Sequence, residues 1–295
     1  MRYKIKYEDS EVTIKDFLKS NSISSNLVRR LKKLPDGIMV NGFHQNVTYV
    51  LKENDLLEIN IDDFDNDINE YLTPTDIPIE IIYEDDNITV VNKPSNMPTH
   101  ESLNNHGNTL ANALKYRYND KAYVFRATNR LDKDTSGVVI TANNRYYASL
   151  ISKKIQNGEV DKEYIALVKG KLTGEGVINA PIDRISESII KREVISTGEE
   201  AISKYKVLSY SENLSLVLLT PVTGRTHQLR VHMAHIGHPI IGDELYGGKS
   251  ELINRQALHC LKMSINGVRE FYAPLALDIK DLVVKYFNED TIPKK

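Results

Sequence analysis

The chain has 295 residues, of which 41% are hydrophobic and 26% charged, a composition typical of a globular protein of one or two domains. No apolar run reaches the length of a membrane span, and the first residues, MRYKIKYEDSEV, lack the apolar core of a signal peptide. The single cysteine, Cys260, excludes an internal disulfide and a multi-cysteine zinc site, and its apolar neighbours predict a buried strand residue. We therefore expect a cytoplasmic protein with no membrane anchor.

The net charge of −2 conceals three segments of different charge. Residues 1–52 hold ten Lys and Arg against five Asp and Glu, and residues 53–86 hold thirteen Asp and Glu with no Lys or Arg. The remainder of the chain carries 28 basic against 22 acidic side chains. Two basic segments therefore flank an acidic one, which is compatible with a polyanionic partner that contacts both of them.

Residues 10–61 predict a small domain of two helices and a hairpin. The stretch VTIKDFLKS favours a first helix, and SSNLVRRLKKL favours a second one that begins at a serine cap. On the second helix Leu27, Leu31 and Leu34 recur at i, i+4 and i+7, so they predict one buried face. Asn41-Gly42 then predicts a tight hairpin turn, and DLLEINI predicts a closing strand.

The second helix is basic, and its charged residues are Arg29, Arg30, Lys32 and Lys33. Taken alone, these four positive charges are as consistent with an ordinary solvated helix surface as with a binding surface. Two helices, the second of them basic, and a following VNG turn resemble the S4-type RNA-binding domain. The resemblance implies that these four side chains dock the protein on structured RNA through phosphate contacts.

The rest of the chain predicts one larger domain. Residues 62–78 are acidic and contain prolines, and we interpret them as a linker to a second domain at residues 79–295. There, IIYEDDNITVVNKP predicts a hairpin, EYIALVKG and SLVLLTPV predict strands, and TLANALKYRY, YYASLISKKIQ and HQLRVHMAHIG predict helices. Because strands outnumber helices and many are joined locally, we expect an α+β fold with a mixed, mainly antiparallel sheet and flanking helices.

Four stretches could carry chemistry: NKPSNMPTH, NRLDKDTSG, DKEYIALVKG and TGRTHQLRVHMAHIGHPIIGDELYG. In the second stretch a charged turn containing Asp132 directly precedes the apolar strand VVITA, so that a carboxylate lies at the edge of the core. Each candidate also has an ordinary structural explanation. Asp132 could cap a turn, Tyr164 could be a half-buried strand aromatic, and Arg225 could bond a loop carbonyl.

The fourth stretch also contains a group of potential metal ligands: His227, His232, His235, His238 and Asp243. A zinc site would need three or more such ligands with supporting carboxylates. The stronger metal spacing, two histidines at i, i+4 followed by a third ligand, is missing. We therefore expect no metal site.

Together, RLDKDTSG, KEYIALVKG and GRTHQLRVHMAHIGHPIIGD resemble the RluA-type family of RNA pseudouridine synthases over about residues 80–275. Members of that family break the C1′–N1 bond of selected uridines, rotate the uracil and rejoin it through C5. The resemblance implies an isomerase with an RNA substrate and with no cofactor or metal. It also implies that a small S4-like α/β domain precedes a pseudouridine-synthase sheet.

By this resemblance Asp132 is the catalytic aspartate, Arg225 is the arginine that pairs with it, and Tyr164 is the tyrosine that lies near the base. Asp132 must be ionised to act, and burial would raise its pKa, whereas an adjacent arginine lowers it. The expected pair between Asp132 and Arg225 would therefore explain why a charge lies at the edge of the core.

The resemblance also implies contacts with the RNA. The target base must leave its stack to react, and Arg130 would enter the vacated space. Leu229 would form an apolar floor under the uracil. RNA or base contacts would come from the residues at the start of the last helix: His227, Gln228 and Arg230.

Position 129 departs from the family pattern, which most often has histidine before RLD. Asn129 can donate and accept hydrogen bonds but does not titrate. Because the other motif residues are present, we interpret Asn129 as a tolerated change next to the site.

We expect a monomer that acts on structured RNA, with large-subunit ribosomal RNA favoured and transfer RNA as the alternative. A non-catalytic RNA-binding or assembly factor is a competing class, but such a protein would be expected to lose Asp132 or Arg225. A metal hydrolase built on the histidines is a third class, and a metal assay would separate it from the other two.

Overall fold

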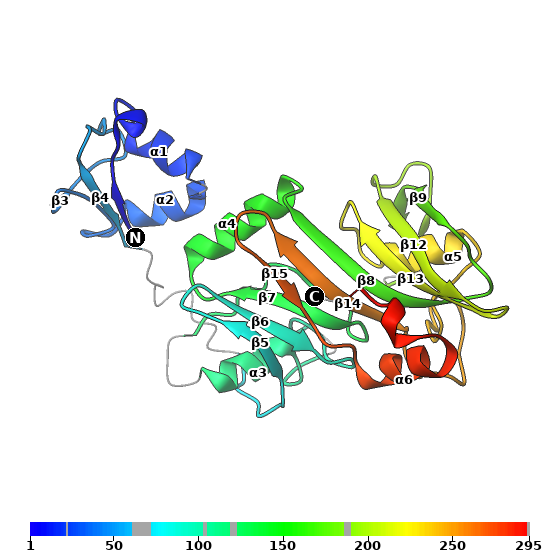
Figure 1. Cartoon of the computed structure of the whole chain (residues 1–295). Helices are drawn as coiled ribbons and strands as arrows, with labels where there is room; N and C mark the ends of the chain where they lie inside the picture. Colours follow the sequence, from blue (N-terminus) through cyan, green and yellow to red (C-terminus); the bar gives the residue numbers. More distant parts are fainter. Residues whose placement is uncertain (22, 61–71, 103–104, 119–122, 186–189, 294–295) are drawn as a thin grey trace.

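The computed structural model describes the chain except for residues 22, 61–71, 103–104, 119–122, 186–189 and 294–295. A small N-terminal domain precedes a larger body built on a nine-stranded sheet (Figure 1). Residues 62–71 of the predicted linker lie outside the described residues. Within the described part of the chain, no helix is both long and apolar enough to cross a membrane.

The N-terminal domain has its own hydrophobic core between two helices and a four-stranded antiparallel sheet. Its elements are β1 (Arg2–Lys4), η1 (Tyr7–Asp9), α1 (Ile14–Ser20), α2 (Ser25–Leu31), β2 (Ile38–Val40), β3 (Phe43–His44) and β4 (Leu56–Ile59), with the sheet order β1-β4-β2-β3. The side chains of Thr13 and Ser24 cap the two helices. Asn41 and Gly42 have φ angles of 52° and 82°, as a two-residue hairpin turn requires.

Helix α2 ends at Leu31, one turn earlier than predicted. Pro35 disfavours a helical conformation at the residue before it, and Leu34 instead donates its backbone N–H to the Leu31 carbonyl at 3.1 Å in a tight turn. Leu27 and Leu31 are buried as predicted, but the prediction that Leu34 continues the same buried face is wrong.

The body contains a mixed, mainly antiparallel sheet, as predicted. Its strands are β5 (Glu80–Glu84), β6 (Ile88–Lys93), β7 (Ser136–Ala142), β8 (Val160–Lys169), β9 (Glu175–Asn179), β12 (Ile202–Tyr210), β13 (Leu214–Pro221), β14 (Leu258–Ile265) and β15 (Arg269–Tyr272). Their order is β5-β6-β7-β14-β8-β13-β12-β9, with β15 paired to β14. Among these described strands, only β7 and β14 run parallel to each other. A separate two-stranded sheet pairs β10 (Ile182–Arg184) with β11 (Arg192–Val194).

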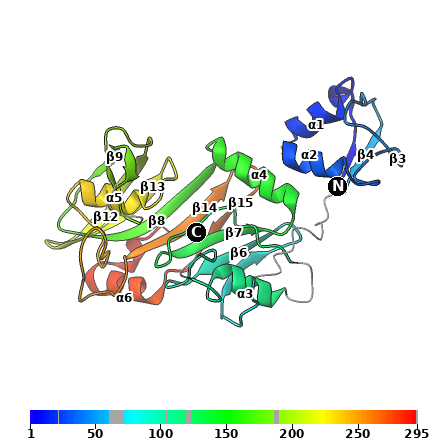
Figure 2. The same ribbon diagram turned by 180° about the vertical axis from the view of Figure 1, so that it is seen from behind.

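The helices of the body are α3 (Leu110–Arg117), α4 (Arg145–Gln156), α5 (Gln228–His235) and α6 (Leu277–Tyr286), followed by the short η3 (Glu289–Thr291). Helix α4 lies at the end of the body that faces the N-terminal domain, and α5 lies at the other end beside β12 and β13 (Figure 1, Figure 2). Tyr146 of α4 packs against the N-terminal core, and Lys153 donates to the Lys19 carbonyl at 3.4 Å. Helix α4 is therefore a point of contact between the two parts.

Three neighbouring strands bring distant segments of the chain together at the middle of the sheet. Tyr164 on β8 is paired with Cys260 on β14 and with Leu219 on β13. The turn that carries Asp132 leads directly into β7, which lies next to β14, and the loop after β13 leads into α5. As a result Asp132 meets Arg230, a residue 98 positions later in the chain.

Strand β7 approaches β14 closely because position 137 is a glycine. The φ angle of Gly137 is 115°, and a Cβ atom there would lie 2.2 Å from the carbonyl oxygen of Cys260. Parallel pairing of the two strands is made at this point, with Ser136 opposite His259 and Gly137 opposite Cys260. Gly137 therefore fixes the end of the Asp132 turn against the sheet.

Replacing Gly137 with Ala is expected to lower the free energy of unfolding by about 3 kcal/mol or more, because a strained φ and overpacking each cost roughly 1–3 kcal/mol. Gly158→Ala is the matched control, since Gly158 also has a positive φ of 73° but has no atom within 4 Å of an added Cβ. It should cost about 1 kcal/mol. Urea unfolding of both variants measures the difference, and equal losses would show that the contact with Cys260 is unimportant.

Candidate active site

The centre of the site is an arginine held between two carboxylates. Arg230, in the first turn of α5, donates from Nη1 to Oδ2 of Asp132 at 3.0 Å. Its Nε and Nη2 donate to the two oxygens of Asp243, each at 2.7 Å. Burial alone would lower the pKa of Arg230, but the hydrogen bonds and charge of the two carboxylates outweigh it and raise that pKa. The guanidinium therefore stays charged and holds Asp132 in one orientation.

Arg225 does not take the place that was predicted for it. Its Nη1 forms an ion pair with Glu199, and its Nε donates to a neighbouring backbone carbonyl. The predicted pair between Arg225 and Asp132 is therefore wrong, and Arg230 makes this contact instead. The reason lies in the start of α5. Arg225 is in the loop before the helix and its side chain is 40% exposed, whereas Arg230 belongs to the buried run 228–233 and its side chain is 9% exposed.

The amide of Gln228 organises the loop that precedes α5. Its Oε1 accepts hydrogen bonds from the Thr223 hydroxyl and from the Arg225 backbone N–H, at 2.8 and 2.9 Å. Its Nε2 donates to the Ile202 carbonyl and to the Ser203 hydroxyl, at 2.9 and 3.0 Å. These four bonds use the full capacity of the amide. The side chain predicted to contact RNA is thus engaged within the protein.

His227 lies next to Asp132 at the first position before α5, in a left-handed conformation with a φ angle of 59°. Its Nε2 is 3.7 Å from Oδ2 of Asp132, and its Nδ1 is 2.9 Å from the Tyr246 hydroxyl. Burial lowers the pKa of His227, although the charge of Asp132 opposes that effect. At neutral pH the ring is therefore uncharged, and Arg230 is the cation that balances Asp132.

Asp132 opens into a cavity of about 290 Å³. Tyr164 and Leu229 line this cavity and are themselves buried, whereas Arg130 lies exposed at its edge. Burial raises the pKa of Tyr164 well above its usual value, and the nearby Cys260 and the charge of Asp132 add to this effect. The phenol is therefore protonated at neutral pH. The cavity combines one carboxylate, a neutral phenol and an apolar wall, which suits a flat heterocyclic base.

Two buried cations hold the backbone of the Asp132 turn. Lys93, fully buried, donates from Nζ to the carbonyls of Pro94, Met97 and Lys133 at 2.7–3.1 Å. Burial lowers the pKa of Lys93 to about 7, while the nearby charge of Asp134 opposes that shift. Three accepting carbonyls require all three ammonium protons, so this anchor needs the charged form of Lys93.

The second buried cation, Arg255, donates to the Asp134 carbonyl at 2.9 Å. It also binds both carboxylate oxygens of Asp278, at 2.6 and 2.7 Å, and so ties the turn to α6. Asn129, at the other end of the turn, donates to the Val138 carbonyl at 3.1 Å and accepts from the Ile140 backbone N–H at 2.9 Å. An asparagine therefore fastens the turn to β7 without any titrating group.

The four basic residues predicted to bind RNA lie in the N-terminal domain and do not line the cavity. Arg29, Lys32 and Lys33 are exposed, whereas Arg30 is only partly exposed. Lys32 is the C-cap residue of α2 and Lys33 lies beyond it, so the basic group covers the end of that helix.

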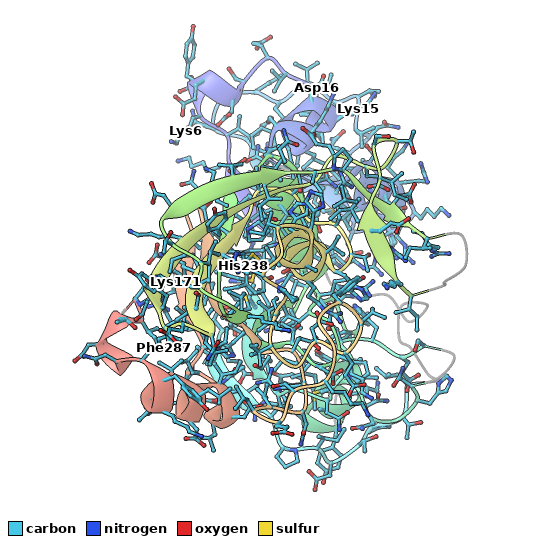
Figure 3. The ribbon with its side chains drawn as sticks, turned by 90° about the vertical axis from the view of Figure 1, so that its right-hand side faces the viewer. Lys6, Lys15, Asp16, Lys171, His238 and Phe287 are labelled. Atoms are coloured by element: carbon cyan, nitrogen blue, oxygen red, sulfur yellow. The ribbon has the colours of Figure 1, made fainter. Side chains whose placement is uncertain are left out.

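The histidines that suggested a metal site point to different partners. His232 is buried and bonds the Ser203 hydroxyl and the Ala180 carbonyl, at 2.8 and 2.9 Å. His238, which is labelled in Figure 3, bonds the Lys169 carbonyl at 2.9 Å. Within the described residues, no three potential metal ligands come together.

Reasoning from sequence did not assign three residues of the site: Lys93, Asp243 and Arg255. Lys93 and Asp243 each come at the end of an apolar stretch, and this was the available signal, whereas Arg255 lies between two amide side chains and offered none. Lys93 follows ITVVN, and Asp243 follows HPIIG. A charge at such a position requires a partner, but the sequence alone does not name that partner.

Comparison with known families shows that the protein is an RNA pseudouridine synthase. A family model described as RNA pseudouridylate synthase matches residues 87–235, which include the Asp132 turn, Tyr164 and Arg230. The chain belongs to the RluA-type family of these enzymes.

Similar proteins extend over most of the chain. It is 36% identical over 281 residues to "Uncharacterized RNA pseudouridine synthase YjbO" of Bacillus subtilis, which covers 92% of this chain and 98% of that protein. It is also 36% identical over 231 residues to "Ribosomal large subunit pseudouridine synthase D" of Escherichia coli O6:H1, covering 71% of each. Among solved structures, human RNA pseudouridylate synthase domain containing 1 aligns with a TM-score of 0.57 at 27% identity, covering 70% of this chain and 95% of that one.

Arg230→Met is expected to lower the free energy of unfolding by about 3–5 kcal/mol, because it leaves the buried carboxylate of Asp243 without its cation. Arg225→Met removes an exposed ion pair and should cost about 0–1 kcal/mol. Urea unfolding compares the two variants directly. Equal losses would contradict the assignment of Arg230 as the buried partner, and Arg230→Met combined with Asp243→Asn should recover part of the loss.

Proposed function

We propose that this enzyme isomerises one or a few uridines in large-subunit ribosomal RNA, acting as a cytoplasmic monomer. The observation that carries the uridine chemistry is Asp132, which Arg230 holds at the wall of a cavity large enough for a base. The names of several relatives, including "Ribosomal large subunit pseudouridine synthase D", support the choice of ribosomal RNA.

Asp132 is the catalytic carboxylate in this proposal. Arg230 donates a hydrogen bond to it and directs it into the cavity, and no proton passes between them, since the guanidinium stays charged. The reaction breaks the C1′–N1 bond and forms the C1′–C5 bond. The proton on C5 is released to water and N1 takes up a proton from water, so that the product is an isomer of the substrate. Tyr164 lies against the base as a neutral phenol, and Leu229 closes the cavity with apolar surface.

The base reaches Asp132 only after it has left its helix, which costs a few kcal/mol. Arg130 is exposed at the edge of the cavity and has a planar guanidinium, which supports the proposal that it enters the vacated stack. We assign residues 1–61 to an S4-like RNA-binding domain and residues 79–295 to the catalytic domain. The exposed basic residues at the end of α2 would bind phosphates away from the reacting base.

Deleting the gene should remove pseudouridine from one or a few positions of large-subunit ribosomal RNA. These positions are mapped with a chemical adduct of pseudouridine that stops reverse transcription. The wild-type gene should restore these positions, and Asp132→Asn should not, because the amide carries no negative charge. The purified Asp132→Asn protein should bind an RNA transcript with nearly wild-type affinity. Restoration by Asp132→Asn would overturn the assigned role, and losses confined to transfer RNA would replace the proposed substrate.

Replacing Arg29, Lys32 and Lys33 together with Ala should weaken RNA binding and make it less dependent on salt. If duplex RNA behaves like duplex DNA, each phosphate contact contributes about −0.9 to the slope of log K against log salt concentration. Loss of three contacts should therefore reduce the magnitude of this slope by up to about 3. The control replaces Lys4, Lys15 and Lys52, three other exposed lysines of the same domain. If both triple variants have the same slope, α2 is not the RNA-binding surface.

A further inference from the structure

Lys162 on β8 is a charged residue of the cavity wall to which the proposed reaction gives no role. It lies two positions before Tyr164, so both side chains are on the same side of the strand, and both line the cavity. Tyr164 is buried, whereas Lys162 is partly exposed. The register with β13 ends at the pair Leu219 and Tyr164, and its continuation brings Pro221, another lining residue, opposite Lys162. Lys162 therefore occupies the solvent end of the wall that has Tyr164 at its inner end.

The cations around the cavity differ in whether the protein neutralises them. Arg230 is paired with Asp132 and Asp243, and Arg225 is paired with Glu199. Lys162 has no hydrogen bond or ion pair with any residue in the described part of the chain. Lys162 therefore lines the cavity without a counter-ion from these residues.

An unpaired, partly buried ammonium is costly in the free protein. Burial lowers the pKa of Lys162, and no carboxylate offsets the effect. Transfer of a charge out of water is unfavourable unless a partner replaces the lost solvation. A bound anion would supply that partner, and lysine is a common point-charge ligand for phosphate.

The substrate of the proposed reaction carries such an anion. A uridine within RNA is joined to its neighbours by phosphodiesters, and its base must reach the inner end of the cavity at Asp132 and Tyr164. The sugar and its phosphate must then remain at the solvent end. Positions two residues apart on a strand are about 6.6 Å apart. The separation of Lys162 and Tyr164 along the wall is therefore similar to the separation of a phosphate and a base within one nucleotide.

We propose that the ammonium of Lys162 binds a phosphodiester directly attached to the reacting uridine. Lys162 is then a substrate-binding residue that holds the flipped nucleotide by its backbone while Asp132 acts within the cavity. This inference rests on the proposed function, because it takes a uridine nucleotide as the ligand.

The test compares uridine with uridine 5′-monophosphate and uridine 3′-monophosphate, titrated into the full-length protein by NMR. The wild type should bind one of the monophosphates roughly tenfold more tightly than uridine, as expected for one hydrogen bond to a charged group. Lys162→Gln should bind all three ligands with the affinity of uridine, and Lys162→Arg should keep most of the preference. Lys169→Gln is the matched control, since Lys169 is an exposed lysine on the same strand.

A preference for the phosphate in Lys162→Gln as large as that of the wild type would overturn the inference. A wild type that binds uridine and its monophosphates equally would also overturn the inference.

Release of tritium from RNA transcripts made with [5-³H]uridine separates this failure from failure of the proposed function. If Lys162→Gln isomerises RNA with a wild-type KM, only the inference fails, whereas a wild type that binds no uridine ligand and releases no tritium overturns both. The inference expects a raised KM with a smaller change in kcat.

Discussion

The structure depends on one guanidinium that serves two carboxylates. Arg230 binds Asp243, which is completely buried, through two short hydrogen bonds, and it binds the partly exposed Asp132 through a third. The planar fork of the guanidinium fixes the angle between these contacts. A buried Asp243 requires this cation, so its two hydrogen bonds hold the guanidinium of Arg230 in place. The third hydrogen bond of Arg230 then orients Asp132 towards the cavity.

The surrounding polar contacts hold the backbone of the Asp132 turn rather than its side chain. Lys93 binds the turn from β6, Arg255 binds it from the segment before β14, and Asn129 fastens it to β7. A carboxylate held in this way needs little rearrangement when charge develops during a reaction. The same arrangement connects α6 to the site through Asp278, although that helix contributes no residue to the cavity lining.

Much of the local structure could be predicted because its causes are local. The hairpin at Asn41-Gly42 requires two positive φ angles, and the capping residues lie next to the helices that they begin. The motif around Asp132 also predicted where a carboxylate would meet the core. The choice between Arg225 and Arg230 could not be made in this way, because both lie near the start of α5 and the sequence does not show which of the two is buried.

The sequence by itself determined the family, the sheet-rich fold and the motifs that supply Asp132, Tyr164 and an arginine, because these depend on residue type and short spacing. Only the tertiary structure decided which side chains meet. It paired Asp132 with a residue 98 positions away, engaged Gln228 within its own loop and left Lys162 facing the cavity without a partner among the described residues. Such contacts depend on the register of β7, β14, β8 and β13, and that register is set by packing across the whole sheet.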